Sequence, residues 1–158
     1  PPRSTLFPYT TLFRSTHLQS WVEEQFTGLN VEISIGDAHQ KISQADLVVV
    51  ASGTATLEIA MLGVPMVVVY KLSAISYQIA KRLLKTDYVS LPNIMLGKEV
   101  VPELIQCKAN ADNIASSALR ILGADNTKLV AELSSIHTQL NQGSAEKSAK
   151  AILAFINA

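Results

Sequence analysis

The chain has 158 residues, a length typical of one domain with a single core. Its 13 Lys and Arg residues balance 13 Asp and Glu residues, so no net charge attracts it to nucleic acid or to another acidic polymer. Hydrophobic residues make up 48% and charged residues 16%, a composition that buries enough apolar surface to exclude overall disorder.

The first fifteen residues, PPRSTLFPYTTLFRS, show neither helical nor strand periodicity. Prolines stand at positions 1, 2 and 8 and the triplet TLF occurs twice, so no regular element is predicted there. The segment resembles translated vector or adapter sequence, and we exclude it from the fold as non-native or disordered. A natural flexible tail is the alternative. The domain is therefore expected to span 16–158.

From residue 16 to residue 99, helical and strand patterns alternate. A helix is predicted at 16–26, ended by a turn at Gly28 and Asn30. The runs at 46–52 and 64–70 are almost wholly apolar, as in central strands that helices cover on both faces. The remaining predicted elements of this region are strands at 31–35 and 87–93 and helices at 39–45, 54–62 and 73–85.

After Glu99 the pattern changes to helical spacing without strands. Helices are predicted at 101–106, 111–122, 127–140 and 145–156. The alternation of strands and helices predicts an α/β fold, a Rossmann-like parallel sheet with helices on both faces that ends in several helices.

The single cysteine, Cys107, cannot form an internal disulfide and has no Cys or His at the short spacing of a zinc site. We therefore expect a cytoplasmic protein without a bound metal. The longest apolar runs, at 47–51 and 64–70, fall well short of the roughly 18–20 residues that cross a bilayer.

The junction between strand 46–52 and helix 54–62 gives the strongest indication of function. Its sequence is VASGTATLE, and a helix that starts near Thr54 points free N–H groups and the positive end of its dipole at the sheet edge. Gly53 lets a ligand approach the backbone closely, and the hydroxyls of Ser52 and Thr54 can cap the helix or bond to a phosphate oxygen. Glu58, one turn further along the same face and among small and apolar residues, can accept from two ribose hydroxyls.

A simpler interpretation of the junction stands beside this one. Ser-Gly-Thr is also an ordinary helix cap, and the dipole alone favours an acidic residue in the first turns. Neither GxGxxG nor GxxxxGK[ST] occurs in the chain, which excludes the standard dinucleotide-binding and P-loop motifs.

Two longer runs are more specific. ADLVVVASGTATLEIAMLGVPMVVVYK (45–71) and KRLLKTDYVSLPNIMLGKEVVPELIQ (81–106) resemble the C-terminal domain of the bacterial lipid-A-disaccharide synthase family. The likeness covers nearly everything after residue 30. ASGTATLE alone is similar to many glycosyltransferases with two Rossmann domains, whereas the LPN and PELIQ blocks are more particular to this family.

The resemblance implies the C-terminal half of a GT-B type glycosyltransferase. It implies an inverting, metal-independent transfer, without a cofactor, of 2,3-diacylglucosamine from UDP to lipid X. The products are the β-1,6 disaccharide and UDP. Inverting transfer needs a general base, which we expect in an N-terminal domain that this chain lacks. The chain is therefore expected to bind UDP weakly and to transfer nothing.

The resemblance also implies roles for particular residues. It assigns the diphosphate to Ser52, Gly53, Thr54 and Ala55, the uridine ribose to Glu58, and the lining of the donor site to Asn93. Asn93 follows a proline and could instead be a turn former, whereas Glu58 on a largely apolar helix needs a partner. Glu103 and Gln106 could belong to the rim of the donor site, to the interface with the missing domain, or to a surface helix.

Two surfaces suggest partners. In the full enzyme, the helix at 145–156 could cross back to the other domain or pair with a second subunit to give a homodimer. The helix at 73–85 carries Lys81, Arg82 and Lys85 beside apolar residues. It could rest on the cytoplasmic face of the inner membrane, which suits acylated substrates, or be a crossover helix with a solvated basic face.

Two other functions stay open. One is another UDP-sugar enzyme of the same fold, an N-acetylglucosaminyltransferase or a 2-epimerase, against which the LPN and PELIQ blocks argue. The other is a non-catalytic α/β binding module with a vestigial nucleotide site, which a failure to bind any uridine nucleotide would favour.

Overall fold

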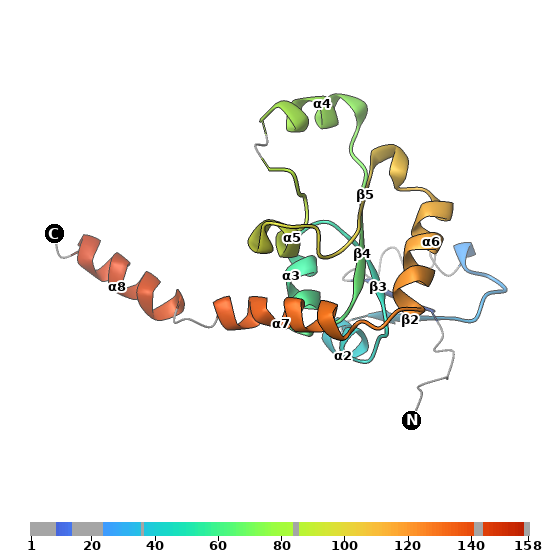
Figure 1. The fold of residues 1–158 in the computed structure, drawn as a ribbon, viewed down its shortest axis with the longest axis horizontal. Helices are drawn as coiled ribbons and strands as arrows, with labels where there is room; N and C mark the ends of the chain where they lie inside the picture. Colours follow the sequence, from blue (N-terminus) through green and yellow to red (C-terminus); the bar gives the residue numbers. More distant parts are fainter. Residues whose placement is uncertain (1–8, 14–23, 36, 84–85, 141–143, 157–158) are drawn as a thin grey trace. The chain divides into compact units, whose positions relative to one another are not determined.

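The computed structural model describes residues 9–13, 24–35, 37–83, 86–140 and 144–156 (Figure 1). The chain divides into two compact units, Pro1–Ala45 and Asp46–Ala158. Each unit has a parallel sheet of its own, with two strands in the first and three in the second. The prediction that 16–158 is one domain stays a prediction.

In the first unit, strand β1 (Tyr9–Phe13) pairs in parallel with strand β2 (Val31–Ile35). The prediction of no regular element before residue 16 is therefore wrong for β1, because pairing with a distant strand leaves no trace in local periodicity. That residues 1–15 are foreign to the fold stays a prediction. β2 has the predicted bounds. Helix α2 (Ala38–Ser43) follows it, close to the predicted 39–45.

The helix predicted at 16–26 lies mostly outside the described residues. Glu24 and Gln25 are helical, and a turn follows in which Gly28 has a φ of 85°. This φ belongs to the left-handed region that glycine adopts without strain. The predicted turn before β2 is therefore confirmed.

The second unit is built on three parallel strands in the order β3-β4-β5. They are β3 (Val48–Ala51), β4 (Met66–Tyr70) and β5 (Glu103–Ile105). The helices are α3 (Thr54–Met61), α4 (Ala74–Leu83), α5 (Leu91–Leu96), α6 (Ala111–Leu122), α7 (Thr127–Leu140) and α8 (Ser144–Ile156), with a 3₁₀ turn η2 (Gln106–Lys108). Figure 1 shows α3 and α6 on opposite sides of the sheet, which confirms the predicted α/β class.

The core of this unit lies between β4 and the helices beside it. Met66 and Val67 in β4 are completely buried, as a strand covered on both faces must be. Leu133 and Ile136, three residues apart on α7, are also completely buried where α7 packs against α3 and α5. β3 is the outer strand of this sheet, and Val49 is 48% exposed, so the prediction of a central strand holds for β4 and is wrong for β3.

Two predicted elements have the wrong type. The strand predicted at 87–93 is a loop that leads into α5, with Ser90 as N-cap and Pro92 in the first turn, where a missing N–H costs nothing. The helix predicted at 101–106 is strand β5 followed by η2. A short apolar run is compatible with either a helix or a strand. Here the segment is a strand because Glu103 pairs with Val68 in β4.

Of the helices in the described part of the chain, none is long and apolar enough to cross a membrane. Two helices nevertheless expose large apolar side chains. In α4, Ile75 is 75% exposed, and in α8, Phe155 is 86% exposed beside Ile152, Leu153 and Ile156. These surfaces are available to partners.

Candidate nucleotide-binding site

The turn between β3 and α3 has a backbone that only glycine adopts readily. Ser52 follows β3, and its N–H donates to the carbonyl of Val69 in β4 at 3.1 Å. Gly53, the N-cap of α3, has φ 151° and ψ −165°. A Cβ built on Gly53 would meet nothing within 4 Å, so the backbone conformation and not space requires glycine.

The N–H groups at the start of α3 have no acceptor within the described part of the chain. Among the described residues, no hydrogen bond is formed by the N–H of Gly53, Thr54 or Ala55. These donors stand at the positive end of the helix dipole and at the carboxyl end of a parallel strand, where α/β sheets bind phosphate groups. The arrangement can therefore bind an anion.

The rest of the turn is fixed by Thr56, which the sequence analysis did not single out. Its hydroxyl donates to the carbonyl of Gly53 at 2.7 Å, and its N–H donates to the same oxygen at 3.1 Å. Thr56 is completely buried. In the sequence, the only indication of this role was a hydroxyl residue at the third position of the predicted helix.

The side chains of the motif differ in what they contact. The Ser52 hydroxyl donates to the carbonyl of Val89 at 2.9 Å, so its one hydrogen is already used. Thr54 and Glu58 are exposed and lie four residues apart on the same side of α3. Glu58 is flanked along α3 by Leu57 and Ile59, and its own side chain is exposed. Its role at the uridine ribose stays a prediction.

Glu103 on β5 holds the loop that precedes α5. Its Oε1 accepts from the N–H and the hydroxyl of Ser90 at 2.9 and 2.6 Å, and its Oε2 accepts from the N–H of Val89 at 2.9 Å. A fourth donor is the Asn93 side-chain amide, at 2.8 Å from Oε1. Both carboxylate oxygens are thus used inside the protein.

Asn93 is completely buried and uses both ends of its amide. Nδ2 donates to the carbonyl of Val101 at 2.8 Å and to Glu103, while Oδ1 accepts from the N–H groups of Val100 and Val101 at 2.8 and 3.0 Å. Its role in lining the donor site stays a prediction. The structure gives Asn93 an internal role, which is to join α5 to the segment that leads into β5.

The side chain of Gln106 also forms hydrogen bonds with the backbone. Its Oε1 accepts from the N–H of Leu72 at 2.7 Å and its Nε2 donates to the carbonyl of Leu72 at 3.1 Å. Its φ of 54° is the one positive value at a non-glycine position in the described part of the chain. Glu103 lies on β5, and Gln106 is the first residue of the 3₁₀ helix η2. Together they fasten the two loops that follow β4 and precede α5.

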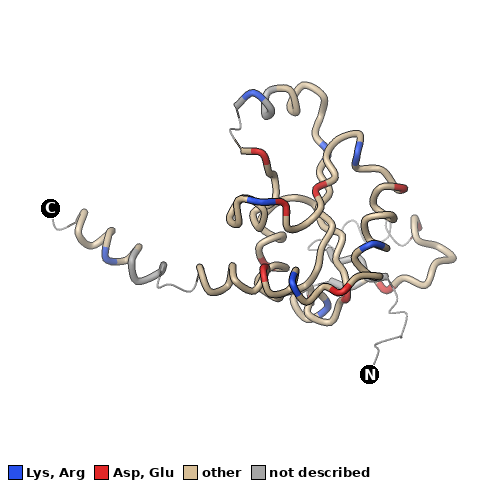
Figure 2. The backbone as a smooth tube through the Cα atoms, in the orientation of Figure 1, with Lys and Arg blue, Asp and Glu red and all other residues tan. Residues whose placement is uncertain are grey.

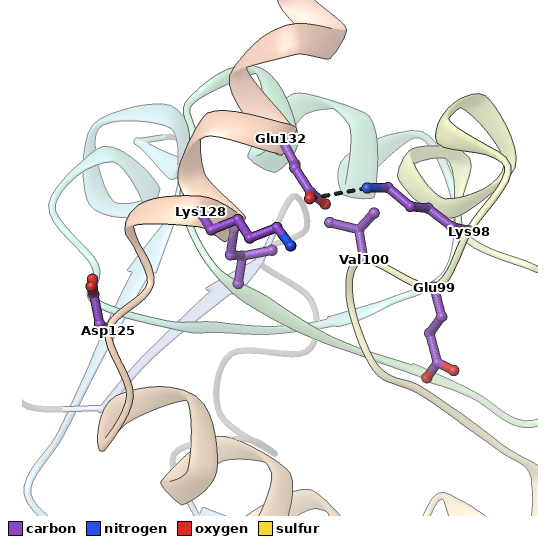
Figure 3. Close-up of a pocket in the computed structure, with 7 residues that line it drawn as sticks. Lys98, Glu99, Val100, Asp125, Lys128 and Glu132 are labelled. Atoms are coloured by element: carbon purple, nitrogen blue, oxygen red, sulfur yellow. Dashed lines mark ion pairs between the residues drawn. The ribbon is translucent and has the colours of Figure 1, made fainter.

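A second surface feature does not belong to this site. A pocket of about 420 Å³ lies between the segment 98–100 and α7 (Figure 3). Lys98 and Glu132 form an ion pair of 3.0 Å across it. Its other lining residues are Glu99, Val100, Asp125, Lys128 and Leu129. The mixture of charges favours no particular ion, in keeping with the interspersed acidic and basic residues of the described part of the chain (Figure 2).

A parallel sheet with helices on both faces and an open helix N-terminus at its carboxyl edge defines an α/β domain of the type that forms the C-terminal half of GT-B glycosyltransferases. A family model described as lipid-A-disaccharide synthetase matches residues 3–156, and the chain belongs to this family.

The curated relatives below are each named lipid-A-disaccharide synthase. Lipid-A-disaccharide synthase of Methylobacillus flagellatus is 42% identical over 131 residues, which are 81% of this chain and 34% of the relative. Lipid-A-disaccharide synthase of Syntrophus aciditrophicus is 42% identical over 144 residues, which are 87% of this chain and 38% of the relative. Lipid-A-disaccharide synthase of Idiomarina loihiensis is 33% identical over 149 residues, which are 94% of this chain and 39% of the relative. The chain therefore spans less than half the length of the curated relatives it matches.

Proposed function

We propose that this chain is the donor-binding part of a lipid-A-disaccharide synthase. The whole enzyme would transfer 2,3-diacylglucosamine from UDP to lipid X, giving the β-1,6 disaccharide and UDP. The observation that carries the proposal is the row of N–H groups at Gly53, Thr54 and Ala55, which find no acceptor among the described residues, in a chain of this family. Such a row suits a diphosphate, which offers several anionic oxygens to one helix terminus.

The same groups would assist the departure of UDP. When the acceptor hydroxyl attacks the sugar, the bond from the anomeric carbon to the diphosphate breaks and negative charge grows on the leaving oxygen. Fixed N–H donors and the dipole of α3 stabilise that charge without reorganising. The proton of the acceptor hydroxyl must go to a general base, which we assign to a part of the enzyme outside this chain.

The exposed side chains complete the donor site. The Thr54 hydroxyl stands at the start of α3 beside the proposed diphosphate position, and Ser52 shapes the turn that presents it. Glu58 lies one helical turn further on, so its carboxylate can accept from both hydroxyls of the uridine ribose. Asn93 would support the site from within, through the segments that it joins.

Replacing Glu58 with alanine is expected to weaken UDP binding about tenfold, because hydrogen bonds to a charged acceptor contribute about 1.5–3 kcal/mol. Calorimetric titration of UDP into the 158-residue chain measures this. Glu99→Ala, which removes another exposed carboxylate, is the matched control and should bind UDP like the unmodified chain.

Two results would count against the proposal. Equal affinity of Glu58→Ala and the unmodified chain would remove Glu58 from the site. No binding of UDP by the folded, unmodified chain would remove the nucleotide site itself. Comparing UDP-2,3-diacylglucosamine with UDP-N-acetylglucosamine as ligands then separates this family from other UDP-sugar enzymes.

The exposed apolar residues of α8 are the proposed dimer contact. Phe155 and Ile156 are 86% and 70% exposed, and burying such side chains between two copies removes apolar surface from water. Sedimentation velocity of the purified chain should show a dimer, and Phe155→Ser should shift it toward monomer. A monomer at all concentrations would contradict the contact.

α4 is the proposed contact with the cytoplasmic face of the inner membrane. Ile75 and Arg82 are exposed on it, whereas Lys85 lies outside the described residues. The side chain of Lys81 also lies outside the described part of the chain. An apolar residue and a basic one exposed on the same helix suit the surface of an anionic bilayer. The chain should sediment with phosphatidylglycerol vesicles and not with phosphatidylcholine vesicles. Equal recovery with both would contradict the contact.

A further inference from the structure

One peptide group connects β5 to the nucleotide-binding turn. It is the peptide that joins Val89 to Ser90. Its N–H donates to Oε1 of Glu103 at 2.9 Å, and its carbonyl accepts from the hydroxyl of Ser52 at 2.9 Å. A carboxylate and a hydroxyl therefore hold the two ends of a single planar group, and neither can move without affecting the other.

The carboxylate end of this connection is firmly held. Glu103 is anchored in β5 by pairing with Val68, and its two oxygens receive the four donors described above. Hydrogen bonds to a carboxylate are roughly twice as strong as neutral ones, and they polarise the amide that donates. The carbonyl of Val89 is therefore both fixed in position and a better acceptor for Ser52.

The hydroxyl end has a chemical consequence. Ser52 has one hydroxyl hydrogen, and that hydrogen is donated to Val89. A diphosphate oxygen carries no hydrogen at neutral pH, so it needs donors, and Ser52 has only lone pairs left to offer. In this geometry Ser52 fixes the turn and leaves the contact with phosphate to the N–H groups that follow it.

We infer that Glu103 is a positioning residue of the nucleotide-binding turn. It acts through the peptide between Val89 and Ser90 on Ser52, and so sets the direction of the N–H groups of Gly53, Thr54 and Ala55. This inference rests on the proposed function, since it assigns a role at the same site. Glu103 and Ser52 then act together on the orientation of these N–H groups, and neither needs to contact the ligand.

The test uses Glu103→Gln, Ser52→Ala and the double variant of the 158-residue chain. Glutamine keeps the shape of Glu103 and replaces one acceptor oxygen by an NH₂ group that faces N–H donors. Each single variant is expected to shift the ¹H–¹⁵N resonances of Gly53, Thr54 and Ala55 and to weaken UDP binding roughly tenfold. Because both act on one connection, the double variant should lose little more than either alone.

Glu132→Gln is the charge-matched control, since it also removes one carboxylate charge. Glu132 lies on α7 and forms an ion pair with Lys98, which follows α5. This variant should leave those resonances and the affinity for UDP unchanged. Unshifted resonances in Glu103→Gln, or a double variant whose loss equals the product of the two single losses, would overturn the inference.

Two further outcomes are decisive. If the unmodified chain binds no UDP, the proposed function fails, while the resonance shifts still decide whether Glu103 positions the turn. If Glu103→Gln does not fold, Ser52→Ala tests the inference instead. If Ser52 and Glu103 are connected through the peptide between Val89 and Ser90, removing the Ser52 hydroxyl must shift the resonances of Val89 and Ser90. Their constancy would overturn the inference.

Discussion

Replacing Asn93 with alanine is expected to lower the free energy of unfolding by about 3 kcal/mol or more, because several buried polar groups lose their partner at once. The N–H groups of Val100 and Val101 and the carbonyl of Val101 all bond to this side chain, and Asn93 is completely buried, so water cannot replace it readily. Urea unfolding followed by circular dichroism measures the loss.

Asn113→Ala is the matched control. Asn113 is an exposed residue of α6 whose amide donates to the carbonyl of Lys108 at 3.1 Å, so water replaces the lost bond and the change should cost less than about 1 kcal/mol. A loss for Asn93→Ala as small as that of the control would show that the buried network contributes little to stability.

Replacing Gly53 with alanine is expected to weaken UDP binding about 100-fold. The combination of φ 151° and ψ −165° is open almost only to glycine, so alanine either strains the backbone by about 1–3 kcal/mol or turns the N–H groups away from the phosphate position. Calorimetric titration measures the affinity, and circular dichroism verifies that the variant is folded.

Gly97→Ala provides a control of the same kind. Gly97 has a φ of 65° at the C-cap of α5, and a Cβ added there also meets nothing within 4 Å. This substitution should cost about 1 kcal/mol of stability and leave UDP affinity unchanged. If Gly53→Ala bound UDP as tightly as Gly97→Ala does, the backbone of the turn would not be the phosphate contact.

The long periodic segments were predictable from the sequence. The helices at 111–122 and 127–140 have the predicted bounds, and β4 and α3 agree to within two residues, because a repeated apolar pattern over several turns or a buried run leaves few alternatives. The position of the turn at Gly53 was predictable for the same reason, since it follows directly from where an apolar strand ends and a helix begins.

The short strands β1 and β5 were not predictable, because pairing with other strands decides their type. β1 forms where β2 supplies its hydrogen bonds, and Glu103 lies in a strand because it pairs with Val68 in β4. The role of Asn93 could not be foreseen either, because the sequence does not distinguish an asparagine that bonds inside the protein from one that contacts a ligand. Only the burial and the four hydrogen bonds of its side chain distinguish them.

The connection through Val89 and Ser90 also affects when the turn becomes ordered during folding. Ser52 contacts Val89, 37 residues further along the chain, and Ser90 contacts Glu103 after another 13 residues. Closing such loops costs chain entropy before the contacts repay it. We therefore expect the segment 52–55 to gain its final geometry only after β5 has paired with β4. A nucleotide that binds this geometry would therefore stabilise the fully paired sheet and not partly folded forms that lack β5.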